Sequence, residues 1–265
     1  MSLPEDYGCY QNGHVQFEDR DTVLRALERL ELSRGEALEV WPARSLPDGI
    51  FVSPPRNGWI SLWQAGATLH DWFVELTATL ECRGVLFGND DDAGWSVSLF
   101  QDGRRIGHCQ MPFCWEERGI LIGLALEELD DEGVEITDPD HPRVRKVMKR
   151  LANTEEYAQL LEEVRRLRFG EDELIPFAGS ETASRRAWRC IETGERFARR
   201  DDAEYSVTET QTRFAACLGI LDTEWDPNLD LPLLQEGDYD DLEGLPAGFE
   251  EFVLAPSGRL TVFQD

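Results

Sequence analysis

The sequence predicts an α+β fold in which helices pack on a mainly antiparallel sheet in the N-terminal half of the chain. Three short apolar or alternating runs lie close together, at residues 85–87, 95–100 and 104–108. Two turn signals separate them, and one is the pair Asp102-Gly103, which accepts the positive φ angles of a tight hairpin. We therefore expect a three-stranded antiparallel meander over residues 84–109.

The middle run has the spacing of a strand with one buried face. Trp95, Val97 and Leu99 alternate with Ser96, Ser98 and Phe100. Side chains along a strand point alternately to opposite faces, so this spacing sends the first set into a core.

The other elements of the first half alternate between strands and helices, which is typical of α+β proteins. A strand at 14–17 precedes a helix that Asp21 can cap. Further strands are predicted at 38–41, 50–52 and 59–63, and Asn57-Gly58 makes the last two a hairpin with a long loop. Apolar residues at helical spacing predict a helix over 70–80. The apolar run at 120–126 fits a helix or a central strand, and we favour a helix.

An acidic stretch with two prolines, residues 130–142, marks a boundary after which helices follow one another. Apolar periodicity predicts four of them, and the second would begin with Asn153 and Glu156 as a capping box. Ser180 and Thr208 would open the third and fourth, and Gly219 would end the fourth. We predict an α+β sheet domain at 1–136 and a small α-helical subdomain at 137–220.

The remaining segment, 221–265, is acidic and contains two strand signals, at 252–254 and 260–263. Ala255-Pro256-Ser257-Gly258-Arg259 between them predicts a terminal hairpin. Such a hairpin could return to pair with the N-terminal sheet.

Charge is the strongest global feature, with 53 acidic and 26 basic residues and a net charge of −27. Acids outnumber bases 25 to 10 in residues 1–136 and 12 to 1 in 221–265, whereas residues 137–220 carry 16 and 15. Such a field repels nucleic-acid phosphates and anionic membrane surfaces, and it favours a basic protein partner. The interpretation that we favour for the charge itself is that it only keeps the protein in solution.

Cellular context is inferred from what the chain lacks. No run reaches the roughly 20 apolar residues of a membrane helix, and the first residues do not form a secretory signal. Six cysteines scattered over 265 residues indicate free, mostly buried thiols. We expect a cytoplasmic protein.

Two clusters are candidates for metal binding. Asp90, Asp91 and Asp92 could hold a hard cation, but they do not match the EF-hand pattern, and a solvated turn is the favoured interpretation. His108, Cys109 and Cys114 lack the second ligand pair that zinc usually needs, and on a strand His108 and Cys109 would point to opposite faces. We therefore assign no metal and no cofactor.

Catalytic templates fail as well. His70 and Asp71 could serve as a base and its orienting group, but no nucleophile is evident, and no Gly-x-Ser-x-Gly or phosphate-binding glycine motif is present. No catalytic residue is assigned.

Tryptophans supply the candidate binding residues. Trp59 and Trp63 share a strand face by parity, and with Trp95 they could form a half-exposed aromatic strip rimmed by Asp90, Asp91 and Asp92. For at least half of the eight tryptophans, however, core packing is the interpretation that we favour. The favoured hypothesis is a non-catalytic intracellular protein-interaction module, of which an inhibitor or immunity protein is one form. The alternative is a metal-dependent hydrolase using the Asp cluster with His108 or His70, and a structural or regulatory subunit is a third hypothesis.

Overall fold

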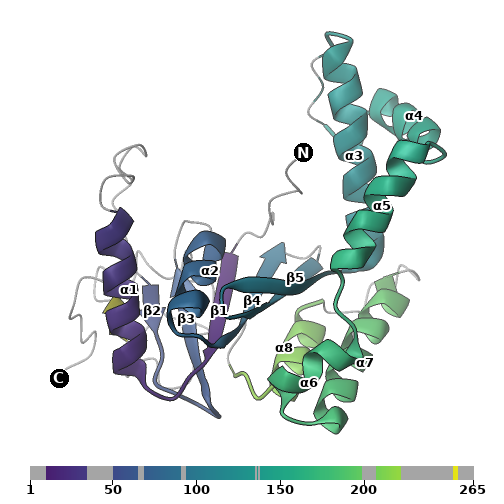
Figure 1. Ribbon diagram of the computed structural model, residues 1–265. Helices are drawn as coiled ribbons and strands as arrows, with labels where there is room; N and C mark the ends of the chain where they lie inside the picture. Colours follow the sequence, from purple (N-terminus) through teal and green to yellow (C-terminus); the bar gives the residue numbers. More distant parts are fainter. Residues whose placement is uncertain are drawn as a thin grey trace, which may run out of the picture.

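A computed structural model describes residues 10–34, 50–64, 69–90, 94–134, 136, 138–198, 207–221 and 253–255. Within these residues seven strands form one sheet in the order β6-β5-β4-β1-β3-β2-β7, and every paired neighbour is antiparallel (Figure 1). The strands are β1 (Tyr10–Gln16), β2 (Ile50–Val52), β3 (Trp59–Gln64), β4 (Arg83–Asp90), β5 (Gly94–Gln101), β6 (Arg104–Met111) and β7 (Val253–Ala255). The predicted α+β class with an antiparallel sheet is confirmed.

The described helices fall into three groups (Figure 1). One face of the sheet carries α1 (Arg20–Arg34) and α2 (Leu69–Thr79), and the opposite face carries α6 (Glu171–Ala178), α7 (Glu181–Ala198) and α8 (Val207–Cys217). Between these groups in the sequence, α3 (Phe113–Asp131), α4 (Pro142–Leu151) and α5 (Glu155–Leu167) project away from the sheet, and we call these three helices the arm.

The face under α1 and α2 is built around the ring of Phe73. Val15, Ile60 and Leu62 point to this face because they alternate with residues of the other face along β1 and β3. Gly84 lies directly beneath the ring, and a Cβ atom there would come within 2.7 Å of two ring carbons of Phe73. Glycine is therefore required where the helix approaches the strand backbone most closely.

The opposite face forms a second core with α6, α7 and α8. Phe87 of β4 contacts Phe214 of α8 edge to face, with ring centroids 6.0 Å apart. Trp95 packs on the same ring and donates a hydrogen bond from its indole nitrogen to Thr210 Oγ1 over 3.3 Å. The sheet is thus the middle of three layers, with a hydrophobic core on each side.

The predicted meander consists of β4, β5 and β6. Asp102 and Gly103 have φ angles of 50° and 77°, as the tight turn between β5 and β6 requires. The register between β5 and β6 shifts between Leu99 and Phe100, two pairs away from this turn. This irregularity places His108 opposite Ser98 and Cys109 opposite Val97.

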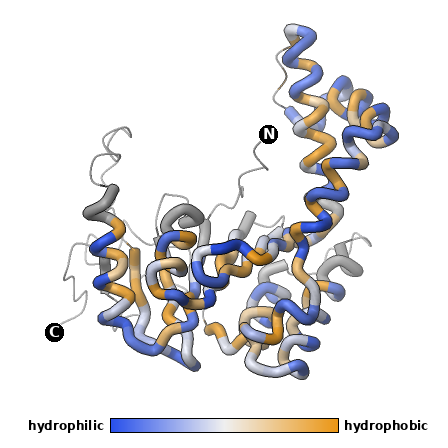
Figure 2. The backbone as a smooth tube through the Cα atoms, viewed as in Figure 1, coloured by the Kyte–Doolittle hydropathy of each residue, from blue (hydrophilic) through white to orange (hydrophobic). Residues whose placement is uncertain are grey.

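The arm has its own apolar core. Ile120 and Leu124 of α3 pack with Val144 of α4 and Val164 of α5. The helix expected over 120–126 is therefore confirmed, as part of α3. Figure 2 shows hydrophobic and hydrophilic residues interleaved along all three arm helices, as expected for helices with one buried side.

Some details differ from the sequence-based expectations. The chain forms an additional helix, α6, whose Leu174 and Phe177 enter the sheet core. Thr154, and not Asn153, caps α5, because its hydroxyl oxygen accepts a hydrogen bond from the Tyr157 N–H. The expected strands at 38–41 and 260–263 lie outside the described residues. The expected return of the C-terminal segment is observed in β7, which pairs with β2. The domain boundaries at 136 and 220 stay a prediction.

Candidate interaction surface

The three tryptophans predicted to form an aromatic strip lie in the interior. Trp59, Trp63 and Trp95 expose 2%, 1% and 2% of their surface, and all point to the sheet face that carries α8. The three indoles therefore belong to the core, in agreement with the core-packing interpretation of the tryptophans. Trp59 and Trp63 share this face because they lie two positions apart on each side of Ser61 in β3, as parity predicts, but the face is covered.

The Asp90 backbone ends β4, where it pairs with Gly94. Its side chain, together with Asp91 and Asp92, lies outside what the structure describes, so the metal-dependent hydrolase hypothesis stays a prediction. Among the described residues no group of three or more His, Cys, Asp or Glu could hold a metal ion. Cys109 is buried in the core and His108 lies on the other face of the edge strand β6, so the two side chains point apart as expected.

Two serine–histidine pairs emerge from the strand register. His14 Nδ1 lies 2.8 Å from Ser61 Oγ, and His108 Nδ1 lies 2.8 Å from Ser98 Oγ. Sequence reasoning missed both, although strand parity places each pair on one face once the register is known. The second pair could not have been aligned from the turn alone, because the irregularity at Leu99 shifts β6 by one residue.

The His14 pair is suited to a structural role. Burial lowers the pKa of the His14 imidazole to about 3, so the ring is neutral. Its Nε2 atom has no hydrogen-bond partner in the described part of the chain, whereas a catalytic triad would place a carboxylate at the second ring nitrogen. Ser61 is buried, so no substrate reaches the hydroxyl in this conformation.

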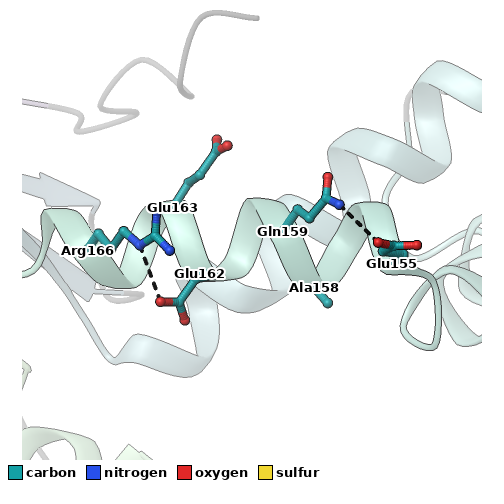
Figure 3. A pocket seen from close by; sticks show the side chains of 6 residues that line it. All are labelled: Glu155, Ala158, Gln159, Glu162, Glu163 and Arg166. Atoms are coloured by element: carbon teal, nitrogen blue, oxygen red, sulfur yellow. Dashed lines mark hydrogen bonds and ion pairs between the residues drawn. The ribbon is translucent and has the colours of Figure 1, made fainter.

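The outer side of α5 presents an acidic surface, which we call the α5 acidic face. A shallow, open hollow lies along it. Figure 3 shows the side chains that line the hollow, which belong to Glu155, Ala158, Gln159, Glu162, Glu163 and Arg166. Gln159 donates a hydrogen bond to Glu155, and Arg166 pairs with Glu162, each over 3.3 Å. Glu163 has no ion-pair partner among the described residues. On the other side of α5, apolar residues that include Leu160 and Val164 pack into the arm core.

The neighbouring helix α4 has the opposite charge. It contains both lysines of the chain, Lys146 and Lys149, which follow Arg143 at three-residue spacing and are exposed like it. None of these three cations forms an ion pair with a described residue. The arm therefore presents a basic helix, α4, and a helix with an acidic face, α5, which both pack on α3.

Ion pairs at the N-terminus of α4 connect this helix to α3. Asp140 accepts hydrogen bonds from Arg145 at 3.0 Å and Arg118 at 2.9 Å. The bond from Arg145, with the charges of both guanidinium groups, holds the pKa of the Asp140 carboxyl below its usual value. Arg165 of α5 pairs with Glu117 of α3 over 3.0 Å. All these groups are partly exposed, so each pair contributes little stability alone.

Comparison of the chain with family models, with curated protein sequences and with solved structures found no match. In the part of the chain that the structure describes, no helix combines the length and apolarity needed to cross a bilayer.

Proposed function

We propose that this chain is a non-catalytic protein-interaction module that binds a basic protein partner through the α5 acidic face. The observation that carries the proposal is the row of carboxylates at Glu155, Glu162 and Glu163 on a helix that projects from the sheet. A projecting helix can be reached from several directions, and its carboxylates lie apart from the buried polar pairs of the sheet.

The net charge of −27 supports the same class of partner. Long-range electrostatic attraction raises the association rate of a basic and an acidic protein. Direct contacts between charged side chains then determine where the partner binds. An inhibitor that covers a basic enzyme or toxin is one form of such a module. In that form the hollow along α5 accepts Lys or Arg side chains of the partner.

Zero-length cross-linking of carboxylates to lysines tests the proposal. The protein is mixed with a cell extract at low salt, cross-linked, digested and sequenced by mass spectrometry. We expect cross-links to a single basic protein at Glu155, Glu162 or Glu163, and we expect them to disappear at high salt as the Debye length falls to about 3 Å. Cross-links spread evenly over exposed carboxylates such as Glu18, Glu28 and Glu192 would contradict the proposal.

The matched control for position is a pair of triple variants. Glu155→Gln/Glu162→Gln/Glu163→Gln and Glu18→Gln/Glu28→Gln/Glu192→Gln each remove three exposed carboxylates, so they change the net charge equally. Only the first variant should lose the partner. Equal loss in both would show that total charge, and not the α5 acidic face, determines binding.

A further inference from the structure

Three exposed cations form a row along α4, and none has an ion-pair partner among the residues that the structure describes. They are Arg143, Lys146 and Lys149, and we call them the α4 basic row. Helix α4 contains no acidic residue. Acidic residues outnumber basic ones 53 to 26 in the chain, so a shortage of carboxylates does not explain why these three cations are unpaired.

The α4 basic row lies on the solvent side of its helix. Val144 and Leu151 of α4 are buried in the arm core. Because an α-helix has 3.6 residues per turn, the row falls on the opposite side of α4 from these two residues. The remaining cations of α4, Arg145 and Arg150, pair with carboxylates of α3 and of the segment before α4. The row is therefore separate from the ion pairs within the arm.

Arg143 lies where a cation lowers the stability of a helix. It is the second residue of α4, after Pro142, and the first turn of this helix has no acidic residue. The N-terminus of a helix carries a partial positive charge, which favours anions, as in the first turn of α5 with Glu155 and Glu156. Lys149, in the last turn of α4, obeys the same rule. A residue that breaks a local rule without a gain inside the chain is typical of a functional position.

The spacing of the row fits carboxylates that another helix presents. Successive members of the row are three residues apart, which corresponds to a rise of about 4.5 Å along the helix axis. Carboxylates three or four residues apart on a second helix have a rise of about 4.5–6 Å, so several pairs can form at once. We propose that the α4 basic row is a docking surface, separate from the α5 acidic face, that binds an acidic helical segment of a protein partner.

The charge of the whole chain favours a short acidic segment over a long polyanion. A nucleic acid or an anionic membrane brings many negative charges near a molecule whose net charge is −27. A single acidic helix brings few charges. It can also approach the arm, which projects away from the sheet (Figure 1).

A synthetic helical peptide whose glutamates recur every three or four residues along one face serves as the probe. Fluorescence anisotropy of the labelled peptide measures its affinity for the full-length protein at about 0.15 M salt, where the Debye length is about 8 Å. This ionic strength screens the repulsion from distant carboxylates more than it screens direct contacts. We expect the glutamate peptide to bind and a peptide with glutamine in place of glutamate to show no binding.

Zero-length carbodiimide cross-linking then locates the bound peptide. Lys146 and Lys149 are the only lysines of the chain, so every amide bond between a peptide glutamate and a lysine of the protein reports on α4. We expect such bonds at both lysines, and an excess of unlabelled glutamate peptide should suppress them. A bound peptide that forms no amide bond with either lysine would contradict this location.

Two variants of the row separate binding from stability. Arg143→Gln/Lys146→Gln/Lys149→Gln should bind the glutamate peptide about tenfold more weakly than wild type, as expected for the loss of three exposed charge contacts. Arg143→Gln alone should weaken binding without lowering the Tm, because it removes a cation from the positive end of the helix. A lower Tm for this variant with unchanged binding would show that Arg143 serves the fold.

The control variant is Arg29→Gln/Arg104→Gln/Arg189→Gln, which removes three exposed cations outside the arm and should stay within about twofold of wild type. The triple glutamine variant of the α5 acidic face should bind the peptide at least as tightly as wild type, so this test does not depend on the function proposed for α5. No binding of the peptide by wild type, equal affinities of the two cation variants, or tighter binding of a DNA duplex or of phosphatidylserine vesicles would overturn the proposal.

Discussion

The indole nitrogen of Trp59 donates a hydrogen bond to the carbonyl oxygen of Leu218 over 2.9 Å, joining residues 159 positions apart. Asn57 reinforces the link, because its side-chain amide donates to the Gly219 carbonyl over 3.1 Å. The last carbonyls of a helix have no partner within the helix, so the sheet supplies one for the chain leaving α8. These two hydrogen bonds connect the end of α8 to the hairpin of β2 and β3.

We predict that Trp59→Phe lowers the free energy of unfolding by about 1–3 kcal/mol, because it removes the only polar atom of the indole and leaves a buried carbonyl unpaired. Chemical denaturation measures the change. Asn57→Gly removes an exposed hydrogen bond, tolerates the φ angle of 52° at this position and serves as the control, with an expected loss below about 1 kcal/mol. Equal effects of the two substitutions would contradict this role of Trp59.

Stability should depend on pH through His14. The imidazole has a pKa of about 3 in the folded chain and about 6.5 when unfolded, so between these values the unfolded state binds the extra proton. The stability that His14 contributes is present above pH 6.5 and is lost as the pH falls toward 3. From pH 7 to pH 5 the wild type should lose about 2 kcal/mol more than His14→Gln, as measured by urea unfolding at both pH values. Parallel losses would contradict the burial of a neutral His14.

One substitution, glycine to alanine, should have opposite effects at two sites. Gly84→Ala should destabilise the protein by about 1–3 kcal/mol, because the new methyl group would overlap the Phe73 ring. Gly123→Ala should stabilise it by up to about 1 kcal/mol, because this position is exposed in α3 and a Cβ there meets no atom within 4 Å. Thermal unfolding measures the stability of both variants. A change in stability of the same sign at both sites would contradict the packing described.

Helix α5 offers a direct comparison of two candidate caps. Thr154→Ala should cost about 1 kcal/mol, because it removes the acceptor for the Tyr157 N–H. Asn153→Ala should cost less, since its side chain only donates to the Lys149 carbonyl over 3.4 Å. If denaturant titrations show that Asn153→Ala lowers the free energy of unfolding more than Thr154→Ala does, Asn153 is the N-cap, as expected from the sequence.

Much of the sheet could be predicted because its signals are local. Asp102-Gly103 specifies a tight turn, and the alternation of Trp95 and Val97 with serines specifies which side chains share a face. The expectation of a single buried face is wrong, because Phe100 on the other face is buried under the opposite layer as well. The register shift at Leu99 was not predicted, because the tight turn specifies only the residue pairs next to it. Helix α6 was missed because Pro176 interrupts the usual helical signal, although Leu174 and Phe177 still reach the core.

The candidate site could be predicted less well than the fold. Strand parity correctly placed Trp59 and Trp63 on one face, but parity does not tell whether a face meets solvent or another layer. Trp59 and Trp95 are covered by α8 and the residues that follow it, which lie more than a hundred residues further along the chain. The α5 acidic face has no short motif and becomes visible only when the arm holds α5 clear of the sheet.

The affinity of the partner captured by cross-linking, measured for the two triple variants at two salt concentrations, tests the central claim most directly. Three exposed charge contacts together account for about a tenfold change in Kd, so the variant at Glu155, Glu162 and Glu163 should bind about tenfold more weakly than wild type. The variant at Glu18, Glu28 and Glu192 should stay within about twofold, and added salt should weaken wild-type binding. Equal affinities for both variants, or binding that ignores salt, would contradict an interaction centred on the α5 acidic face.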